Sequence, residues 1–312
     1  MSKDVDWRQA GHRYYPLAMY MRHEFGEPVW KISLDAHFSC PNIDGTVGRE
    51  GCLFCDAKSF SPGRRFGLEN LEAQMDDGIT QLQRRHSVRK FLAYFQPSTN
   101  TYAPVERLES IFRRAMRRSE IVGLAIGTRP DALPDDVLDL LADLSKETRI
   151  FLEIGLQSAK NESLRFLNRG HNYETFADAI ERAQKRNLCL GTHLILGIPG
   201  ETRDDLIRTA QLVAQWKLHS IKLHNLYVVR NTKLAELWTE NKISLPTCQE
   251  YAEMVVDFLE YQNPETVIER ISGEASEEYL LAPQWTAIKH SARNAVDRAF
   301  RNRNTYQGKL WR

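Results

Sequence analysis

Three cysteines with an unusual spacing are the residues in this sequence best suited to metal chemistry. Cys40, Cys52 and Cys55 form a C-x11-C-x2-C pattern within the stretch CPNIDGTVGREGCLFC. Cys52 and Cys55 are close enough to share one tight turn, and the glycines between Cys40 and Cys52 allow that arm to fold back beside them. Thiolates are soft ligands, so three of them can serve one metal centre. Three thiolates suit an iron–sulfur cluster in which one iron is left open.

Two other interpretations of these cysteines stay open at this level. A C-x2-C pair is also typical of a dithiol redox switch. A structural zinc site normally has four ligands, and a histidine distant in sequence could complete one here, since no fourth Cys or paired His lies nearby. The remaining cysteines, Cys189 and Cys248, are expected to be small buried hydrophobic residues.

The cysteine motif resembles that of the radical-SAM superfamily. In that superfamily three cysteines hold a [4Fe-4S] cluster, and S-adenosylmethionine (SAM) binds the remaining iron through its amino and carboxylate groups. The usual spacing is C-x3-C-x2-C with an aromatic residue before the last cysteine, a position that Phe54 fills here. The longer first gap resembles a bacterial group of unassigned substrate, related to coproporphyrinogen-oxidase-like enzymes and to the catalytic subunit of Elongator. The resemblance extends from about Val29 to about Trp285.

This resemblance implies a radical-SAM enzyme whose [4Fe-4S] cluster is held by Cys40, Cys52 and Cys55. Reductive cleavage of SAM would release a 5′-deoxyadenosyl radical, which abstracts hydrogen from an unidentified substrate. The implied cofactors are the cluster and SAM, and the implied partner is an electron donor such as flavodoxin or ferredoxin. The alternative is a non-catalytic iron–sulfur or zinc protein that binds RNA or a protein partner.

Polar residues within a predicted buried strand are further candidates for ligand binding. In LEIGLQS, alternation places Glu153, Gly155 and Gln157 on one face of the strand. A buried acid and amide destabilise a core unless they bind something. By resemblance, Glu153 and Gln157 contact the ribose or methionyl part of SAM, and Arg169 pairs with its carboxylate through two hydrogen bonds. A satisfied core ion pair is the alternative for Glu153.

Two further SAM contacts, Gln96 and His193, follow from comparison with related enzymes. Gln96 lies in YFQPSTNTY, where related enzymes have a Gly-Gly-Glu-like motif; this chain lacks both glycines and the acid, so an ordinary polar turn is the alternative. His193 stands where related oxidases carry an acid, and either residue can hold a ribose hydroxyl, although a lone histidine is often a core residue. Arg129 and Asp131 either face the site or form a salt bridge with each other.

These side chains need parallel strands to bring them together. Six short apolar runs alternate with amphipathic helical stretches, a pattern typical of buried parallel strands joined by helices. Ligands bind where the carboxyl ends of such strands meet. Six units are too few for a closed eight-stranded barrel, so they predict an α/β fold, a partial parallel (β/α)6 barrel of radical-SAM type with a C-terminal α/β extension. The predicted strands cover residues 29–34, 90–95, 121–126, 149–156, 188–196 and 220–226.

The same pattern divides the chain into three parts. We predict an N-terminal cap over residues 1–28, a radical-SAM core over 29–230 and a C-terminal extension over 231–312. Within the extension, periodicity predicts a helix over 245–261 and a short strand over 266–271.

Composition indicates a globular protein of a reducing compartment. Hydrophobic residues make up 42% of the 312 residues and charged residues 27%, as in ordinary soluble domains. The five cysteines are an odd number without the spacings of a disulfide framework. The charged N-terminus does not resemble a signal peptide, and no apolar run approaches membrane-spanning length. These features predict a cytoplasmic protein without a membrane partner.

The C-terminus suggests a nucleic-acid surface. The net charge is +1, but residues 286–312 contain seven Lys or Arg and one acid. Phe300, Tyr306 and Trp311 are interleaved with these cations, and Arg113–Arg118 could extend the surface. Resemblance to the tRNA-acting catalytic subunit of Elongator makes tRNA a candidate substrate, with a small metabolite or a protein side chain as alternatives. A solvated helix face is the alternative for the basic run, which consists of Lys289, Arg293, Arg298, Arg301, Arg303, Lys309 and Arg312.

Overall fold

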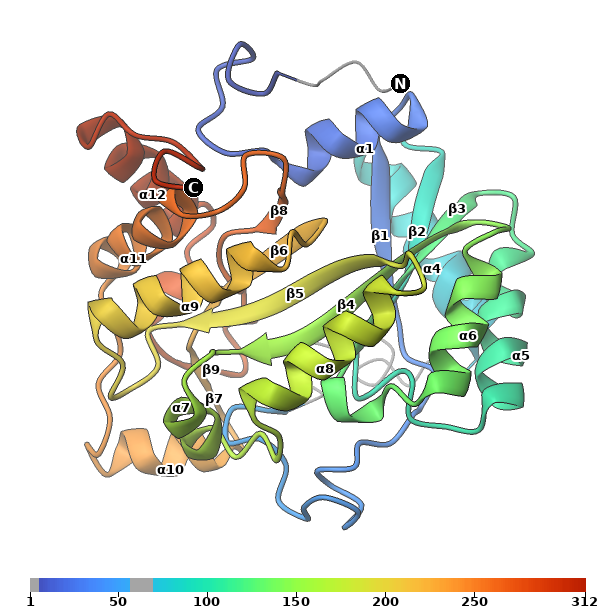
Figure 1. Ribbon diagram of the computed structural model, residues 1–312, viewed down its shortest axis with the longest axis horizontal. Coiled ribbons are helices and arrows are strands. Elements are labelled where there is room, and N and C mark those ends of the chain that lie inside the picture. Colours follow the sequence, from blue (N-terminus) through green and yellow to red (C-terminus); the bar gives the residue numbers. More distant parts are fainter. Residues whose placement is uncertain (1–5, 57–69) are drawn as a thin grey trace.

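A single curled sheet of seven parallel strands organises the molecule (Figure 1). The computed structural model describes residues 6–56 and 70–312. Strand order in the sheet is β1-β2-β3-β4-β5-β6-β8, so neighbouring strands follow one another along the chain. This arrangement confirms the predicted partial barrel. The strands are β1 (Val29–Leu34), β2 (Lys90–Phe95), β3 (Ile121–Thr128), β4 (Arg149–Gln157), β5 (Cys189–Leu196), β6 (Ser220–Asn225) and β8 (Val267–Arg270).

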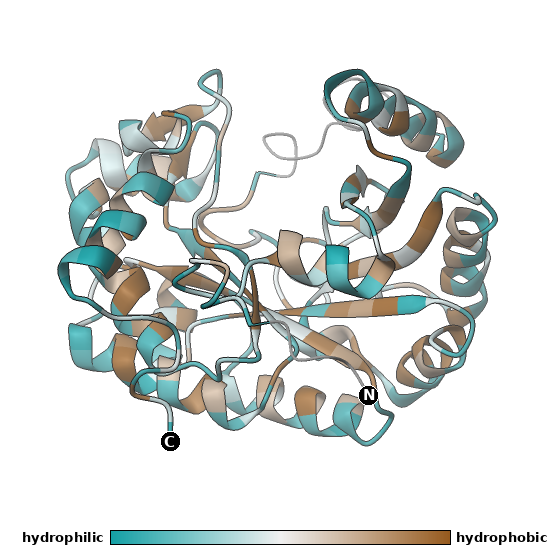
Figure 2. Cartoon of the chain, turned by 90° about the horizontal axis from the view of Figure 1, so that it is seen from above, coloured by the Kyte–Doolittle hydropathy of each residue, from teal (hydrophilic) through white to brown (hydrophobic). Residues whose placement is uncertain are grey.

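Amphipathic helices cover the outer face of the sheet. Their apolar sides join one continuous core with the outward side chains of the strands. Figure 2 shows hydrophilic residues concentrated on the sides of these helices that face away from the sheet. These helices are α4 (Leu71–Arg85), α5 (Val105–Met116), α6 (Asp135–Leu144), α8 (Tyr173–Gln184), α9 (Arg203–Gln215), α11 (Cys248–Glu260) and α12 (Ser291–Asn302). The other helices pack elsewhere: α1 (Leu17–Phe25) in the barrel interior, and α7 (Asn161–Phe166) and α10 (Lys233–Thr239) in a separate small apolar cluster. Short 3-10 turns lie at Pro130–Ala132 and Gln284–Thr286.

The C-terminal segment adds a strand to the barrel itself. Strand β8 pairs in parallel with β6, with Ser220 opposite Val267, so the sheet gains a seventh strand beyond the six expected for the core. Strands β7 (Val228–Val229) and β9 (Leu280–Ala282) form a separate antiparallel pair. The predicted boundary at residue 230 therefore falls between elements that share one sheet.

The N-terminal segment closes the end of the barrel interior that lies away from the carboxyl ends of the strands. Tyr20 and Met21 of α1 are buried against inward-facing strand residues such as Leu92 and Phe151. The tail of the chain packs here too, because the backbone N–H of Gln307 donates to the carbonyl of Arg13. Since this apolar plug fills one end, the polar interior lies toward the carboxyl ends of the strands.

The basic C-terminal run forms the predicted stacking surface only in part, since Trp311 is exposed but Phe300 is not. Phe300 is fully buried in the core, where α12 packs on α11. Arg303 is engaged with Asp257 and Glu260 at 2.8 and 2.5 Å. The predicted pairing of exposed cations with exposed rings is therefore wrong for these two residues, because the amphipathic helix turns its aromatic side inward. Arg293, Arg298 and Arg301 remain exposed.

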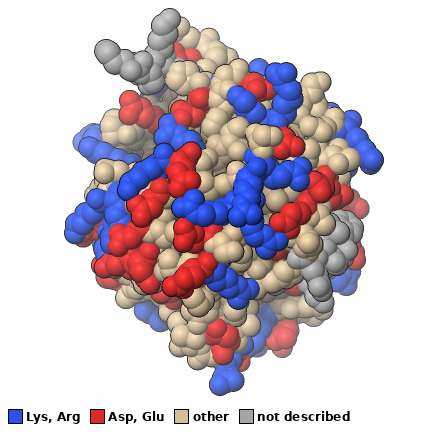
Figure 3. Space-filling view, turned by 90° about the vertical axis from the view of Figure 1, so that its right-hand side faces the viewer, with Lys and Arg blue, Asp and Glu red and all other residues tan. Residues whose placement is uncertain are grey.

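The arginines of α5 do not extend that surface. Helix α5 lies on the opposite side of the barrel from α12 (Figure 1). Arg113 pairs with Glu109 and Glu147, and Arg114 pairs with Glu72. Figure 3 shows this side as an intermixed pattern of basic and acidic side chains. Such a surface has no extended positive patch.

None of the helices in the described ranges is long and apolar enough to cross a bilayer.

Candidate active site

A cavity of about 580 Å³ opens at the carboxyl ends of the parallel strands. Side chains from both halves of the chain line it, from the cysteine loop after β1 to the segment after β8. Seven of the eight side chains predicted to bind the cluster or SAM are brought together here: Cys40, Cys52, Cys55, Gln96, Gln157, Arg169 and His193.

The cysteine loop is held to the barrel by contacts with the segment after α7. The Leu53 N–H donates to the Leu167 carbonyl at 3.1 Å. The side chains of Asn42 and Asn168 reach across in both directions, Asn42 to the Asn168 carbonyl and Asn168 to the Gly51 carbonyl. A tight turn joins Cys52 to Cys55, as expected, with the Cys55 N–H donating to the Cys52 carbonyl at 3.0 Å.

The three thiols share the cavity without meeting at a single point. Among the residues that the structure describes, no three His, Cys, Asp or Glu side chains form the ligand set of one metal ion. An iron–sulfur cluster does not require the three sulfur atoms to meet at one metal ion, because each cysteine binds a different iron. Cys55, like Cys40 and Cys52, would bind iron as a thiolate, whereas a free cysteine thiol is largely protonated at neutral pH. Metal ligation there must therefore be accompanied by loss of a proton.

Arg169 links the cysteine loop to strand β4. Its guanidinium donates to the Cys52 sulfur at 3.2 Å and to the Gly155 carbonyl at 3.1 Å, while its buried Nε has no partner among the described residues. Gly155 leaves the room for this approach, because a Cβ there would lie only 3.3 Å from the Arg169 Nη2. Arg169 thus places positive charge and an unused donor at the cavity.

A second arginine supports this position. Arg129 forms a two-bond ion pair with Asp131 at 2.9 and 2.7 Å, the arrangement weighed against a site role for the two residues. It also donates to the Arg169 carbonyl at 2.7 Å, and its buried Nη1 has no partner among the described residues. Arg129 therefore holds the backbone of Arg169 and keeps one donor near the cavity.

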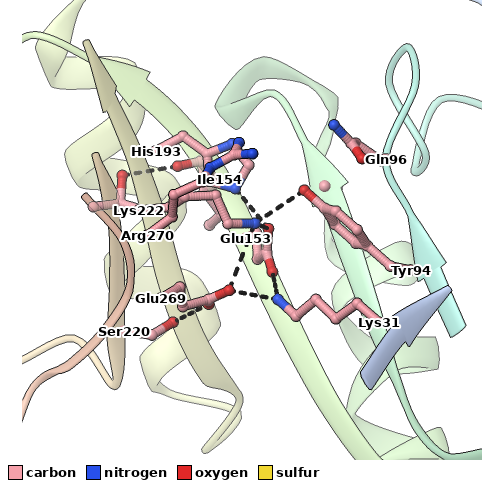
Figure 4. Close-up of polar contacts among 12 residues, drawn as sticks. Lys31, Tyr94, Gln96, Glu153, Ile154, His193, Ser220, Lys222, Glu269 and Arg270 are labelled. Carbon is pink, nitrogen blue, oxygen red and sulfur yellow. Dashed lines mark hydrogen bonds and ion pairs between the residues drawn. The ribbon is translucent and has the colours of Figure 1, made fainter. Parts of the chain in front are cut away.

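Glu153 is not one of the residues that line the cavity, and it lies among Lys31, Lys222 and His193 (Figure 4). Its carboxylate is 1% exposed and contacts Lys31 and Lys222, both at 2.5 Å. Lys31 and Lys222 also pair with Glu269 of β8. We call Lys31, Glu153, Lys222 and Glu269 the interior charge layer. Two ammonium groups facing two carboxylates make this layer formally neutral, and it is the core ion pair that stood as the alternative for Glu153.

Burial and charge oppose each other in this layer. Burial alone would raise the pKa of Glu153, but Lys222 and Lys31 hold the pKa of its carboxyl well below the usual range. The Lys222 ammonium also donates to the Tyr94 hydroxyl at 3.0 Å. Because each charge has partners, the layer can separate the polar cavity from the apolar plug around α1.

His193 connects the charge layer to the cavity. Its Nε2 lies 2.6 Å from Glu153. Burial and then Lys222 lower the pKa of the imidazole, so the ring is neutral at neutral pH. A carboxylate accepts hydrogen bonds only, so Nε2 carries the proton and Nδ1 is left as an acceptor. This tautomer suits a hydroxyl donor in the cavity.

Gln96 and its neighbours occupy the end of β2. The Gln96 amide oxygen accepts from Ser33 at 3.3 Å. Asn100 donates to the carbonyls of Phe95 and Gly127, so it ties β2 to β3. The buried Thr99 hydroxyl has no partner among the described residues and lines the cavity. The segment after β2 therefore differs from an ordinary polar turn, because it contributes a buried polar group to the cavity wall.

Sequence reasoning missed five polar residues of the barrel interior. Lysines and acids within otherwise apolar strands were a usable signal, since they are rarely buried without partners. The missed residues are Lys31, Tyr94, Lys222, Glu269 and Arg270.

Comparison with known protein families identifies the superfamily of this chain. The model of the radical SAM superfamily matches residues 44–213, and that of the radical SAM C-terminal domain matches residues 218–302. The chain belongs to the radical SAM superfamily. Members of this family are enzymes that use a [4Fe-4S] cluster and SAM. Membership argues against the dithiol-switch and zinc interpretations of the cysteines.

Related proteins match along nearly the whole chain. The uncharacterized protein YtqA of Bacillus subtilis is 34% identical over 299 residues, covering 96% of this chain and 93% of its own. Protein YhcC of Escherichia coli is 35% identical over 295 residues and 92% of each chain. Among solved structures, archaeal Elp3 of Methanocaldococcus infernus superposes with a TM-score of 0.62 at 16% identity. The match covers 89% of this chain and 64% of the Elp3 chain, and at that identity it supports the fold alone.

The residues of the cavity fit the group that the family binds. The cavity offers three thiols, the donor type that iron–sulfur clusters require. It also has unpartnered buried donors on Arg129 and Arg169, which suit an anionic group such as a carboxylate.

Proposed function

We propose that this protein binds a [4Fe-4S] cluster through Cys40, Cys52 and Cys55 and uses it to cleave SAM for hydrogen abstraction from a substrate. The observation that carries the proposal is that these three thiols and Arg169 line one cavity at the carboxyl ends of the strands. When bound, the cluster supplies the electron for cleavage of SAM into methionine and a 5′-deoxyadenosyl radical. A flavodoxin or ferredoxin is the proposed electron donor.

The protein's own residues bind and orient SAM. Arg169 has an unpartnered buried donor for the methionyl carboxylate, and its contact with Cys52 keeps it beside the cluster ligands. The amides of Gln96 and Gln157 line the same cavity and are proposed as further polar contacts. His193 offers an acceptor for a ribose hydroxyl. Glu153 is proposed to act on SAM through His193, whose tautomer it fixes, rather than by direct contact.

Anaerobic reconstitution tests the proposal. The protein should take up about four irons per chain, and reduction in the presence of SAM should yield 5′-deoxyadenosine. Changing Cys40, Cys52 or Cys55 singly to Ala should abolish both results. Cys189→Ala is the control, because Cys189 lies at the start of β5 and not on the cavity. Stoichiometric zinc in place of iron, or full iron in Cys40→Ala, would refute the ligand set.

RNA is the substrate class favoured by one surface feature. Arg293, Arg298 and Arg301 are exposed on α12, which gives this part of the molecule a positive face. Binding of tRNA should weaken steeply with added salt, because phosphate neutralisation releases counterions. Deletion of residues 297–312 would not test RNA binding alone, because it would also remove the buried Phe300 and Gln307 and so destabilise the fold.

Charge reversal tests the RNA hypothesis without disturbing the core. The triple variant Arg293→Glu, Arg298→Glu and Arg301→Glu should lose tRNA affinity and show a shallower salt dependence. The control reverses Lys146, Arg165 and Lys185, which are exposed at or just beyond the C-terminal ends of other helices. Equal tRNA affinity in the two triple variants would point to a small metabolite or a protein side chain.

A further inference from the structure

Arg270, at the end of β8, is one of the positively charged residues that line the cavity. Its Nη2 donates to Nε2 of His224 at 2.8 Å. Its Nε is buried, with no hydrogen-bond partner in residues 6–56 and 70–312. Across the part of the chain that the structure describes, no carboxylate lies within ion-pair distance of its guanidinium.

An irregularity in β8 places this arginine in the interior. Strict alternation would turn Glu269 and Arg270 to opposite faces of the sheet. The pairing of β8 with β6 instead shifts by one residue, from Ile221 opposite Ile268 to Lys222 opposite Arg270. Glu269 can therefore join the charge layer while Arg270 lines the cavity above it (Figure 4). Irregular pairing of this kind often redirects side chains next to active sites.

The positive charge of Arg270 is not neutralised by its surroundings. The interior charge layer is formally neutral within itself, with two lysines and two acids. His224 cannot offset a cation, because burial and then Arg270 itself hold the pKa of its imidazole well below the usual range. A neutral His224 accepts the hydrogen bond from Arg270 and thereby orients the guanidinium. The Arg270 charge therefore faces the cavity without an ion-paired carboxylate among the described residues, and the acids that line the same cavity are Asp56 and Glu274.

The wall around Arg270 is closely packed. The Gly273 N–H donates to the Asn225 side chain at 2.9 Å, and the Asn225 amide donates to the Thr286 hydroxyl at 2.9 Å. A Cβ on Gly273 would lie 2.8 Å from the Tyr227 ring and 3.2 Å from His224. The segment after β8 thus packs directly on the residues that orient Arg270, as expected for a preorganised binding group.

We propose that Arg270 binds an anionic group of the substrate, a carboxylate or a phosphate, so that the enzyme acts on an anionic molecule. This inference rests on the proposed radical-SAM function, in which Arg169 takes the carboxylate of SAM and leaves Arg270 for the second ligand of the cavity. The Nε and Nη1 of the planar guanidinium have no partners among the described residues, and such a fork matches either oxyanion.

Anion binding to the full-length, cluster-bearing protein with SAM bound is the test. The probes are inorganic phosphate and acetate, titrated by calorimetry into wild type, Arg270→Gln and Arg270→Lys. We expect Arg270→Gln to lose roughly tenfold to a hundredfold in affinity for at least one probe, and Arg270→Lys to lose less. Arg230→Gln is the matched control, because Arg230 is exposed and its side chain donates to the backbone carbonyl of Glu278 at 3.2 Å.

Each outcome is informative. Loss confined to phosphate identifies a phosphate-bearing substrate, and loss confined to acetate identifies a carboxylate. Equal binding of both probes to wild type and Arg270→Gln would overturn the proposal. So would a fall in SAM affinity as large as that in Arg169→Ala, because Arg270 would then be a SAM contact. Failure of the proposed function appears separately, as absence of 5′-deoxyadenosine in wild type, since probe binding does not depend on turnover.

Discussion

Arg169 joins the proposed cluster ligands to the proposed SAM site. Its guanidinium contacts Cys52 and the Gly155 carbonyl, and its Nε remains free for a further acceptor. We expect Arg169→Ala to retain iron but to weaken SAM binding by roughly tenfold to a hundredfold, the effect of losing a charged hydrogen bond. Equilibrium binding of SAM to the reconstituted variant measures this. Arg165→Ala, an exposed position on α7, should bind SAM as wild type does. Unchanged affinity in Arg169→Ala would remove Arg169 from the SAM site.

At the scale of elements, the cysteine loop depends on a glycine outside it. Gly170 has a φ of +70°, and a Cβ there would lie 2.5 Å from Val47 and 3.0 Å from Asn42 of the loop. Gly170→Ala should therefore displace the loop and lower iron uptake on reconstitution. Gly26→Ala is the matched control, because Gly26 has a φ of +72° with nothing within 4 Å.

Both alanine variants should lose stability through the same left-handed backbone conformation, by about 1–2 kcal/mol. Only Gly170→Ala should lose iron in addition. Equal iron content in the two variants would show that the close packing of Gly170 against the loop is not needed for cluster binding.

The sheet depends on the interior charge layer, which draws one residue from each of β1, β4, β6 and β8. Lys222→Met should destabilise the protein by about 3–5 kcal/mol, because it leaves the buried carboxylates of Glu153 and Glu269 with one ammonium partner instead of two. The midpoint of urea unfolding measures this loss. Lys146→Met, which removes an exposed pair with Asp143, should shift the midpoint little. A small shift in Lys222→Met as well would mean that the layer is not paired in solution.

At the scale of the whole molecule, this layer predicts how stability depends on pH. The pKa values of Glu153 and Glu269 are lowered in the folded protein, where lysines overcome the opposing effect of burial. The unfolded chain therefore binds more protons than the native protein below a pH of about 4.3, the usual value for Glu. This part of the stability is present above that pH and is lost progressively as the pH falls further.

Unfolding midpoints compared across this acidic range should show the effect. Other carboxylates also titrate here, so the informative quantity is the difference between wild type and Lys222→Met. The variant has lost one of the ammonium groups that lower the pKa of Glu153, and its stability should fall less steeply with acid. Parallel curves for the two proteins would contradict the assignment of the pH dependence to the charge layer.

The amino-acid sequence by itself determined the elements and the class of chemistry. The predicted strands over 29–34 and 90–95 coincide with β1 and β2, and the remaining predicted strands differ from the observed ones by at most two residues at an end. Strand formation follows from local apolar patterning, which a short stretch of sequence contains in full. The spacing of the three cysteines and the adjacent aromatic residue is likewise local, and it was sufficient to indicate the family.

Only the tertiary structure decided which groups neutralise one another. Glu153 meets Lys31 and Lys222 across separations of 122 and 69 residues, so its sequence neighbours could not show that its charge was already paired. The irregular pairing that turns Arg270 into the cavity depends on the register between β6 and β8. Phe300 appears in sequence as an aromatic residue among cations, yet helix packing buries it. In each case the outcome depends on partners that folding brings together from distant parts of the chain, and a local pattern carries no information about those partners.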